Sequence, residues 1–420
     1  MIAPRHAPDA SSALPLSLLA TIAVLLSLLP IQLYSVALPH LTSDLRIGSV
    51  AAGLIPSTAF VTAACTSVPL GRYVDRVGYS KPLLLHGVAS VLALGLLSVA
   101  LGTVMLVAYG LLGGLVLAAA NPATNHLVAE RVAPSSRGRV VGWKQSGVPA
   151  AWIFTGLAVP PLVGVLGWRP AVLVAGLAPI VLFFVLLLRE GRPSRRRSQP
   201  TPGPSAETSP SSPSLAVGSV GTADDRIGGM SQKISFWYAL LMGCATAVVN
   251  VYLYTFAVSR LQLSTAASGM VLVVMGAAGV AGKVIWGIRS GRSRRPAVIL
   301  QQLALIGLFA MGGLAVSEFV PQPMLSLTLA AVAAGFSLFA WTSPLMVLAI
   351  ADSRAASGIG VRTARAMRPF FLGMFVGPPF FGLLLDLGGG FTAGWLVFGG
   401  CSAASAALVT PSAIRERGGA

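Results

Sequence analysis

Long apolar runs, each ended by charge, proline or glycine, recur along the whole chain. The first extends from Leu14 to Leu38 without a charged residue. It exceeds both the roughly 20 residues that a helix needs to cross a bilayer and the apolar core of a cleaved signal peptide. The runs are rich in Leu, Ala and Gly and lack the alternation of membrane β-strands. They predict twelve membrane-spanning helices, over residues 14–38, 49–70, 82–101, 104–129, 140–165, 170–188, 234–258, 265–288, 296–316, 323–350, 357–384 and 391–411.

A stretch rich in Pro, Ser and Gly interrupts these runs at residues 190–231. Such a composition cannot bury enough apolar surface to fold, so we expect a disordered cytoplasmic linker. The linker separates a first six-helix bundle at residues 14–189 from a second at 232–411, and short cytoplasmic tails flank them at 1–13 and 412–420. The predicted fold class is therefore an all-α integral membrane protein with two pseudo-symmetric six-helix bundles.

Composition agrees with a membrane protein, because 55% of the residues are hydrophobic, 10% are charged and the mean hydropathy is +0.80. The net charge is +17, and the basic residues gather in alternate loops. Of 29 basic residues, only Arg46, Arg169 and Arg260 fall in loops on the other side, and Lys283 lies within a span. Cytoplasmic loops carry such an excess, which predicts a multi-pass protein of the cell membrane with both termini in the cytoplasm. The charge thus indicates topology and attraction to anionic lipid rather than nucleic-acid binding.

Several function classes lack the residues that they need. Cys65, Cys244 and Cys401 fall in separate spans, so we expect no disulfide framework, metal site or cofactor. No phosphate-binding G-x-x-x-x-G-K-[ST] motif appears, so ATP is not expected to drive the protein. An intramembrane enzyme would need clustered catalytic groups at one depth, and a sensor would carry a folded soluble module. Neither feature is present, so we expect no enzyme.

The two halves of the chain repeat one another. Gly71 and Arg76 in the first half recur in the second as Gly287 and Arg292, at the same spacing. Parallel half-repeats are how one large class of transporters is built. Because the matching residues recur in the same order in both halves, the sequence favours a transporter.

The segment from Gly71 to Pro82, GRYVDRVGYSKP, holds four charged residues. It resembles the loop between the second and third helices of the major facilitator superfamily, whose pattern is G-x-x-x-D-R-x-G-[RK]. Tyr79 stands where that family usually has a basic residue. The resemblance extends over nearly the whole chain, through the helix count, the linker and the repeat. The matching residues are Gly71, Asp75, Arg76 and Gly78.

A second copy of this segment ends the eighth predicted helix, where Gly291 stands in place of the usual acidic residue. The resemblance implies alternating access, with Asp75 and Arg76 stabilising the outward-facing state. Electrostatics allows Asp75 to face the positive end of another helix or a neighbouring arginine. The other interpretation is that the basic residues of these loops only fix the topology. The candidate cytoplasmic gate comprises Gly71, Asp75, Arg76, Gly78, Gly287 and Arg292.

Glycine and proline concentrate in the fifth and eleventh predicted helices. Small residues let helices approach closely, and neighbouring helices can satisfy the carbonyls that proline frees. A hinge or sliding surface between the halves and tight static packing both fit this composition. The residues include Gly147, Pro149, Gly156, Pro160, Gly377, Pro378 and Gly382.

Polar side chains at membrane depth are the best guides to a substrate site. Asn121 lies about ten residues from the cytoplasmic end of its helix, or roughly 15 Å, which is near the midplane. The first and seventh helices line the central cavity in the family that the chain resembles. The candidate substrate-binding residues are Gln32, Tyr34, Asn121, Asn125, Asn250, Tyr252 and Trp341.

Cations also enter the spans. Lys144 and Gln145 lie about one turn inside the fifth helix, as Arg362 does in the eleventh, and these three are candidate contacts for an anionic substrate. The alternative is that such residues snorkel to lipid phosphates, and for Lys283 we prefer that interpretation.

All twelve acidic residues fall in loops or at the ends of predicted helices. Because a buried carboxylate is the usual proton carrier and cation partner, proton-driven export of cationic drugs loses support. His126 is the candidate for proton coupling, and its alternative role is a hydrogen bond to a neighbouring helix.

Two transport functions remain. The preferred one is a secondary transporter, expected to be a monomer in the lipid bilayer, that moves a small polar or anionic organic solute and couples to a proton or ion. The alternative is an exporter of hydrophobic compounds in the same fold. The alternative would require a cavity lined by Phe60, Trp152, Phe256, Trp341 and Phe370.

Overall fold

The computed structural model describes residues 10–132, 134–190, 232–293, 295–345 and 359–418. Every regular element in these ranges is a helix, and twelve helical stretches are long and apolar enough to span a membrane. These findings confirm the predicted all-α membrane fold. The expected linker at 191–231, the first tail up to residue 9, and the side chains of Arg292 and Arg362 lie outside what the structure describes.

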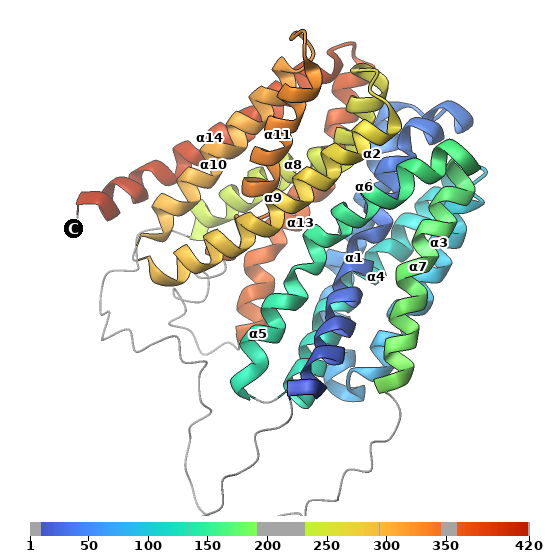
Figure 1. Ribbon diagram of the computed structural model, residues 1–420. Helices are drawn as coiled ribbons and strands as arrows, with labels where there is room; N and C mark the ends of the chain where they lie inside the picture. Colours follow the sequence, from blue (N-terminus) through green and yellow to red (C-terminus); the bar gives the residue numbers. More distant parts are fainter. Residues whose placement is uncertain (1–9, 133, 191–231, 294, 346–358, 419–420) are drawn as a thin grey trace, which may run out of the picture.

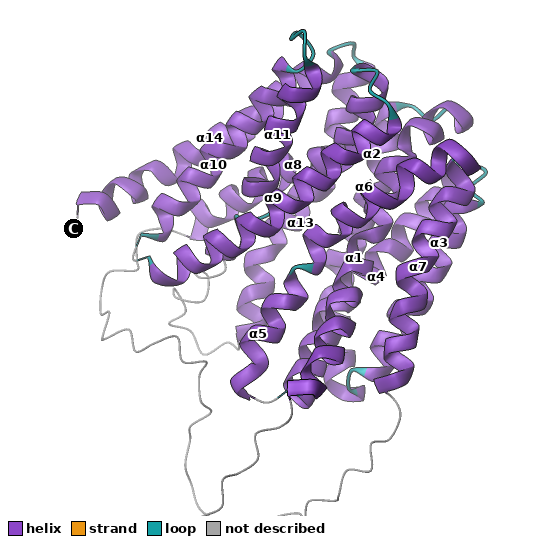
Figure 2. Cartoon of the chain, viewed as in Figure 1, coloured by secondary structure: helices purple, strands orange, loops and turns teal. Residues whose placement is uncertain are grey.

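Each apolar run folds into a helix because hydrocarbon offers no partners for backbone N–H and C=O groups. The N-terminal half contains α1 (Ala10–Leu45), α2 (Ser49–Val77), α3 (Ser80–Ser98), α4 (Thr103–Arg131), α5 (Pro134–Gln145), α6 (Gly147–Leu166) and α7 (Trp168–Glu190). The C-terminal half contains α8 (Gln232–Thr255), a π-helical turn η1 (Phe256–Arg260), α9 (Thr265–Arg292), α10 (Pro296–Val316), α11 (Pro323–Leu338), α13 (Ile359–Asp386) and α14 (Gly390–Gly418). Short loops join most of them (Figure 2).

Two predicted spans are interrupted. The fifth span, expected to be continuous over 140–165, is split into α5 and α6 at Ser146. Pro149 lacks the N–H that would bond to the carbonyl of Gln145, and this explains the break. The tenth span was expected over 323–350, but α11 ends at Leu338 and a turn follows, with Pro344 just beyond it.

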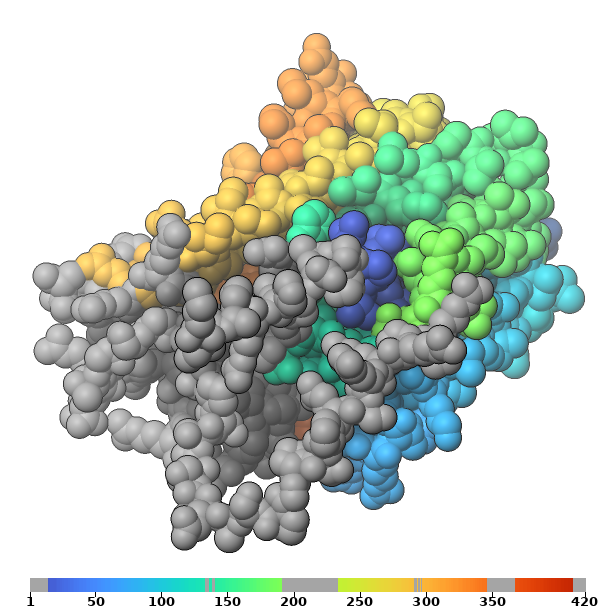
Figure 3. All heavy atoms as spheres, turned by 60° about the horizontal axis from the view of Figure 1, so that its bottom comes forward, coloured from blue at the N-terminus to red at the C-terminus, as the bar shows by residue number. Residues whose placement is uncertain are grey.

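The two halves meet along three helix pairs, α2 with α13, α6 with α9, and α1 with α8. From these contacts the helices of the two halves diverge toward the end where α5 begins and α7 ends (Figure 1). We call this the basic end, because it carries the basic loops, and we call the opposite end the closed end. Figure 3, turned toward the basic end, shows the N-terminal half in blue and green beside the yellow and orange helices of the C-terminal half.

Small residues make these contacts possible. A Cβ atom added to Gly53 would overlap the backbone at Pro378, and one added to Gly156 would overlap the backbone carbonyl of Gly269. Helix backbones can approach this closely only where side chains are absent. Of the glycines and prolines noted in the fifth and eleventh spans, Pro149, Gly156, Pro160, Pro378 and Gly382 therefore lie at the boundary between the halves. Gly147 and Gly377 instead pack against α1 and α8 of their own halves.

Candidate functional site

At the closed end, a carboxylate of one half caps a helix of the other. Asp386, the last residue of α13, accepts hydrogen bonds from the backbone N–H groups of Ser49 (3.2 Å) and Val50 (3.1 Å), which begin α2. The N-cap residue of α2, Gly48, has no side chain to serve this purpose. Asp386 therefore satisfies otherwise free donors and places its negative charge at the positive end of α2.

Two tyrosines of the predicted substrate site also join the helices at the closed end. The Tyr252 hydroxyl lies within hydrogen-bond distance of the carbonyls of Pro378 (3.0 Å) and Ser49 (3.2 Å). The Tyr34 hydroxyl donates to the carbonyl of Ala52 (2.8 Å). Both side chains are buried, so in this state their hydroxyls bind backbone.

Gln32, another predicted substrate residue, is buried between α1 and α6. In the amide orientation that pairs donors with acceptors, its nitrogen donates to the Ala151 carbonyl (2.8 Å) and its oxygen accepts from Trp152 Nε1 (3.2 Å). Thr155 lies 3.3 Å from the same amide. In this arrangement Gln32 connects two helices of the N-terminal half.

A small apolar cluster lies between the halves at the centre of the molecule, with contributions from α1, α2, α4, α8 and α13. We call it the boundary cluster, and its members include Ile31, Phe60, Leu117, Ala247, Phe371 and Met374.

Asn121 and Asn125 continue the face of α4 that enters this cluster. They follow Leu117 at steps of four residues toward the basic end, so they share its face of the helix. Both are exposed, whereas Thr124 on the adjacent face is buried. The structure thus brings the two asparagines together where the halves begin to diverge.

Lys144 lies behind Asn125. Its side chain is fully buried, and its Nζ donates to Thr124 Oγ1 (3.1 Å) and to Asn125 Oδ1. Because the Asn125 oxygen faces this cation, the two N–H groups of its amide remain as donors on the exposed side. Gln145, the next residue, is partly buried. Among the described residues, Lys144 forms no ion pair with a carboxylate.

The other predicted substrate residues lie on the C-terminal half. Asn250 is only 8% exposed, and its Oδ1 has no hydrogen-bond partner within the described part of the chain. Trp341 is buried, donates to Thr246 Oγ1 (3.3 Å) and packs against the ring of Phe370. Asn250 therefore retains a free acceptor near the boundary between the halves.

His126, the candidate for proton coupling, points away from the asparagines. It lies 3.5 Å from Glu130 and packs against the ring of Tyr79, at the contact of α4 with the start of α3. Its role in proton coupling stays a prediction.

The gate residues lie at the basic end. Asp75 and Arg76 are exposed on the last turns of α2, which ends at Gly78 with a φ of 77°. Within the described ranges Asp75 has no ion pair, and the space beside Gly71 and Gly287 is open. The role of these residues as a gate at the basic end stays a prediction.

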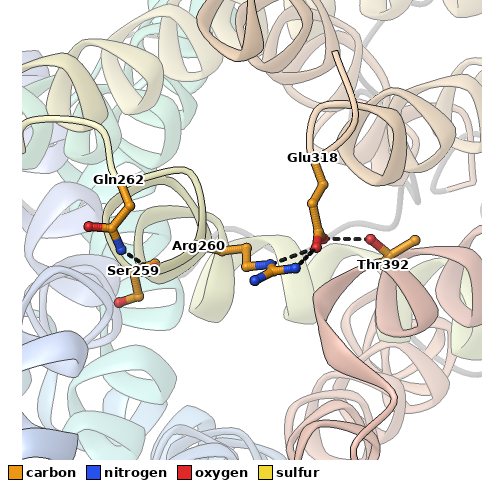
Figure 4. Close-up of polar contacts among 5 residues, drawn as sticks. All are labelled: Ser259, Arg260, Gln262, Glu318 and Thr392. Carbon is orange, nitrogen blue, oxygen red and sulfur yellow. Dashed lines mark hydrogen bonds and ion pairs between the residues drawn. The ribbon is translucent and has the colours of Figure 1, made fainter. Parts of the chain in front are cut away.

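The sequence analysis missed a polar cluster within the C-terminal half (Figure 4). Arg260, at the end of η1, forms an ion pair with Glu318 in the loop after α10, and Thr392 of α14 donates to the same carboxylate (2.6 Å). Burial alone would raise the pKa of Glu318, but the hydrogen bonds from Arg260 and Thr392 hold the pKa below its usual value. An isolated acid and base in separate loops gave no signal of this pairing.

No group of three or more His, Cys, Asp or Glu residues that could hold a metal ion occurs among the described residues.

Comparisons with known proteins agree on the family. The model described as Major Facilitator Superfamily matches residues 20–366. The hexuronate transporter of Bacillus subtilis (strain 168) is 26% identical over 200 residues, which are 47% of each chain. The 4-hydroxybenzoate transporter PcaK of Pseudomonas aeruginosa is 31% identical over 155 residues, 36% of this chain and 34% of that protein. The chain thus spans about half and about a third of the length of these relatives.

Solved structures share the fold over almost the full length. A D-xylose-proton symporter superposes with a TM-score of 0.69 at 17% identity, covering 95% of this chain and 97% of that one. A bacterial homolog of the human lysosomal transporter Spinster, inward-facing and unoccupied, gives 0.68 at 15% identity, covering 97% of each chain. At these identities the likeness concerns the fold alone.

Proposed function

Because the chain belongs to the Major Facilitator Superfamily, we propose that it is a secondary transporter that carries a small organic anion across the membrane by alternating access. The observation that carries this proposal is the buried Lys144, held only by a hydroxyl and an amide oxygen beside the exposed Asn125. A buried cation without a carboxylate is costly, so it favours a ligand that supplies the negative charge.

The chemistry of this site suits a carboxylate. The Asn125 amide N–H groups, oriented by Lys144, provide donors on the exposed face of α4, and Asn121 adds another amide one turn away. The ring of Phe371, which is only partly buried in the boundary cluster, is available to contact the apolar part of an organic solute. The names of the two relatives, a hexuronate transporter and a 4-hydroxybenzoate transporter, both denote organic acids.

The contacts between the halves differ at the two ends of the molecule, and this difference supports alternating access. The closed end is held between the halves by Asp386 and Tyr252, which bind Ser49, while Asp75 has no ion pair among the described residues at the basic end. We place the basic end in the cytoplasm, since cytoplasmic loops carry the excess of Lys and Arg. The state is then inward-facing, and the outward-facing state forms when Asp75 engages the C-terminal half and the Asp386 cap is released.

The alternative, export of hydrophobic compounds, finds less support. Four of the aromatic residues expected to line such a cavity are at most 2% exposed, because they pack against neighbouring helices. These are Phe60, Trp152, Phe256 and Trp341.

The test is solute counterflow into proteoliposomes with 4-hydroxybenzoate and glucuronate as probes. We expect the wild type to exchange at least one of these anions and not a lipophilic cation. Lys144→Met should reduce exchange by more than ten-fold, and Lys144→Arg should retain part of it. The matched control is Lys233→Met, at an exposed position at the start of α8. Equal exchange by wild type and Lys144→Met would reject the anion site, and exchange of the cation alone would favour the exporter.

A further inference from the structure

Lys283 is a second intramembrane lysine, on α9 of the C-terminal half. It lies about nine residues before the end of α9 at Arg292, or roughly 13 Å along the helix axis, so it is well inside the span. Snorkelling to lipid phosphates would require the side chain to lie on the lipid-facing side of the helix.

The lipid-facing side of α9 is marked by Met270, Val284 and Ile288, which are 47%, 55% and 52% exposed. Lys283 is not on it. Its neighbours one turn away on the same face, Gly279 and Trp286, are both buried. Lys283 itself is partly exposed, on a different face of α9 from Met270, Val284 and Ile288.

The face that carries Lys283 also contacts the N-terminal half. Cβ atoms added to Gly276 and Gly279 would lie 2.8 Å from the oxygen and 3.3 Å from the Cβ of Pro149 on α6. Lys283 is one turn beyond this contact toward the basic end, roughly 6 Å along α9. Lys144 precedes Pro149 by five residues, roughly 7.5 Å in the same direction. The two lysines are therefore at similar depth, one on each half.

Among the described residues, neither lysine has an acidic partner. The acidic residues within the described ranges all lie in a loop or in the last turn of a helix. An unpaired cation at this depth is costly and marks a substrate path. A bound anion would supply the negative charge that the described residues around Lys283 lack.

We propose that Lys283 is the cationic contact of the C-terminal half for the transported anion, so that the solute is held between Lys283 and the Asn125 amide that Lys144 orients. This inference rests on the function proposed above and adds a second binding residue to it. A solute bound by both halves interacts more strongly when they approach at the basic end, and so favours closure there.

The experiment measures binding of 4-hydroxybenzoate and glucuronate to the purified full chain by isothermal titration, followed by counterflow. Lys283→Met should weaken binding of the anion at least ten-fold and reduce counterflow, while Lys283→Arg stays within about three-fold of wild type. The exposed Lys233→Met is the matched control and should bind as wild type does. The melting temperature of Lys283→Met without ligand should equal or exceed that of wild type, since an unpaired cation has been removed.

The outcomes separate the two proposals. Normal binding by Lys283→Met, together with lost binding by Lys144→Met, would overturn the role of Lys283 and leave the transport of an anion intact. If wild type binds neither anion, the proposed function itself fails. Should Lys283→Met not fold, Lys283→Gln takes its place. Failure of both to fold while Lys283→Arg folds would assign Lys283 a structural role and overturn the proposal.

Discussion

At Lys144, a charge that the sequence places near one end of a span is covered by protein and held by Thr124 and Asn125. The sequence could single out Lys144, because a basic residue inside an apolar run is visible without a structure. It could not show that Asn125 carries the exposed donors, that Gln32 binds α6 or that Tyr34 binds α2, since those contacts depend on helix packing. The sequence shows that a polar residue lies within a span, but only the packed structure shows which of its polar atoms are left without a partner.

Asn250 provides a prediction at this scale. Its buried Oδ1 has no hydrogen-bond partner among the described residues, and a buried carbonyl without a partner costs about 1–3 kcal/mol. Asn250→Leu, of similar size, should therefore leave the thermal stability unchanged or raised while it lowers counterflow of a hydroxylated anion. Thr246→Val is the control, because Thr246 Oγ1 has protein partners and its loss should destabilise. A clear loss of stability in Asn250→Leu would show that the side chain serves the fold.

Among the elements, the helices were largely predictable and their interruptions were not. The lipid environment forces long apolar runs into helices, so the twelve spans follow from the sequence. Pro149 could have indicated the break at Ser146, but a proline inside a membrane helix often bends the helix without breaking it. The cap of α2 by Asp386 joins residues 337 positions apart, and nothing local reveals it. The domain boundaries remain predictions.

The cluster of Arg260, Glu318 and Thr392 ties the π-helical end of α8 to the loop after α10 and to α14. Because the folded-state pKa of Glu318 is lowered, its contribution to stability is complete above the unfolded-state pKa, with a reference value of 4.5, and is lost as the pH falls through the folded value. Glu318→Gln should lower the melting temperature at pH 7, with a difference from wild type that shrinks toward pH 3. Glu130→Gln, at an exposed position, is the control. A difference that stays constant with pH would show that the ionised carboxylate does not stabilise the loop.

At the scale of the whole molecule, a carboxylate lies near each end of α2. Asp386 at the end of α13 caps the start of α2 at the closed end, and Asp75, near the opposite end of α2, forms no ion pair with a described residue. If the halves exchange these contacts, each state is stabilised by a carboxylate facing the other half. Asp386→Asn would keep some hydrogen bonding but lose the charge, and should shift the population toward opening of the closed end.

The most direct measurement is the pair of distances between spin labels across each end, by double electron-electron resonance, with and without the transported anion. The three native cysteines are first replaced. Exposed positions suit the labels: Lys81 with Arg289 across the basic end, and Leu101 with Phe319 across the closed end. Alternating access predicts that the anion shortens the first distance and lengthens the second, and that Asp386→Asn lengthens the second without ligand. Two distances that stay fixed, or that lengthen together, would contradict the account.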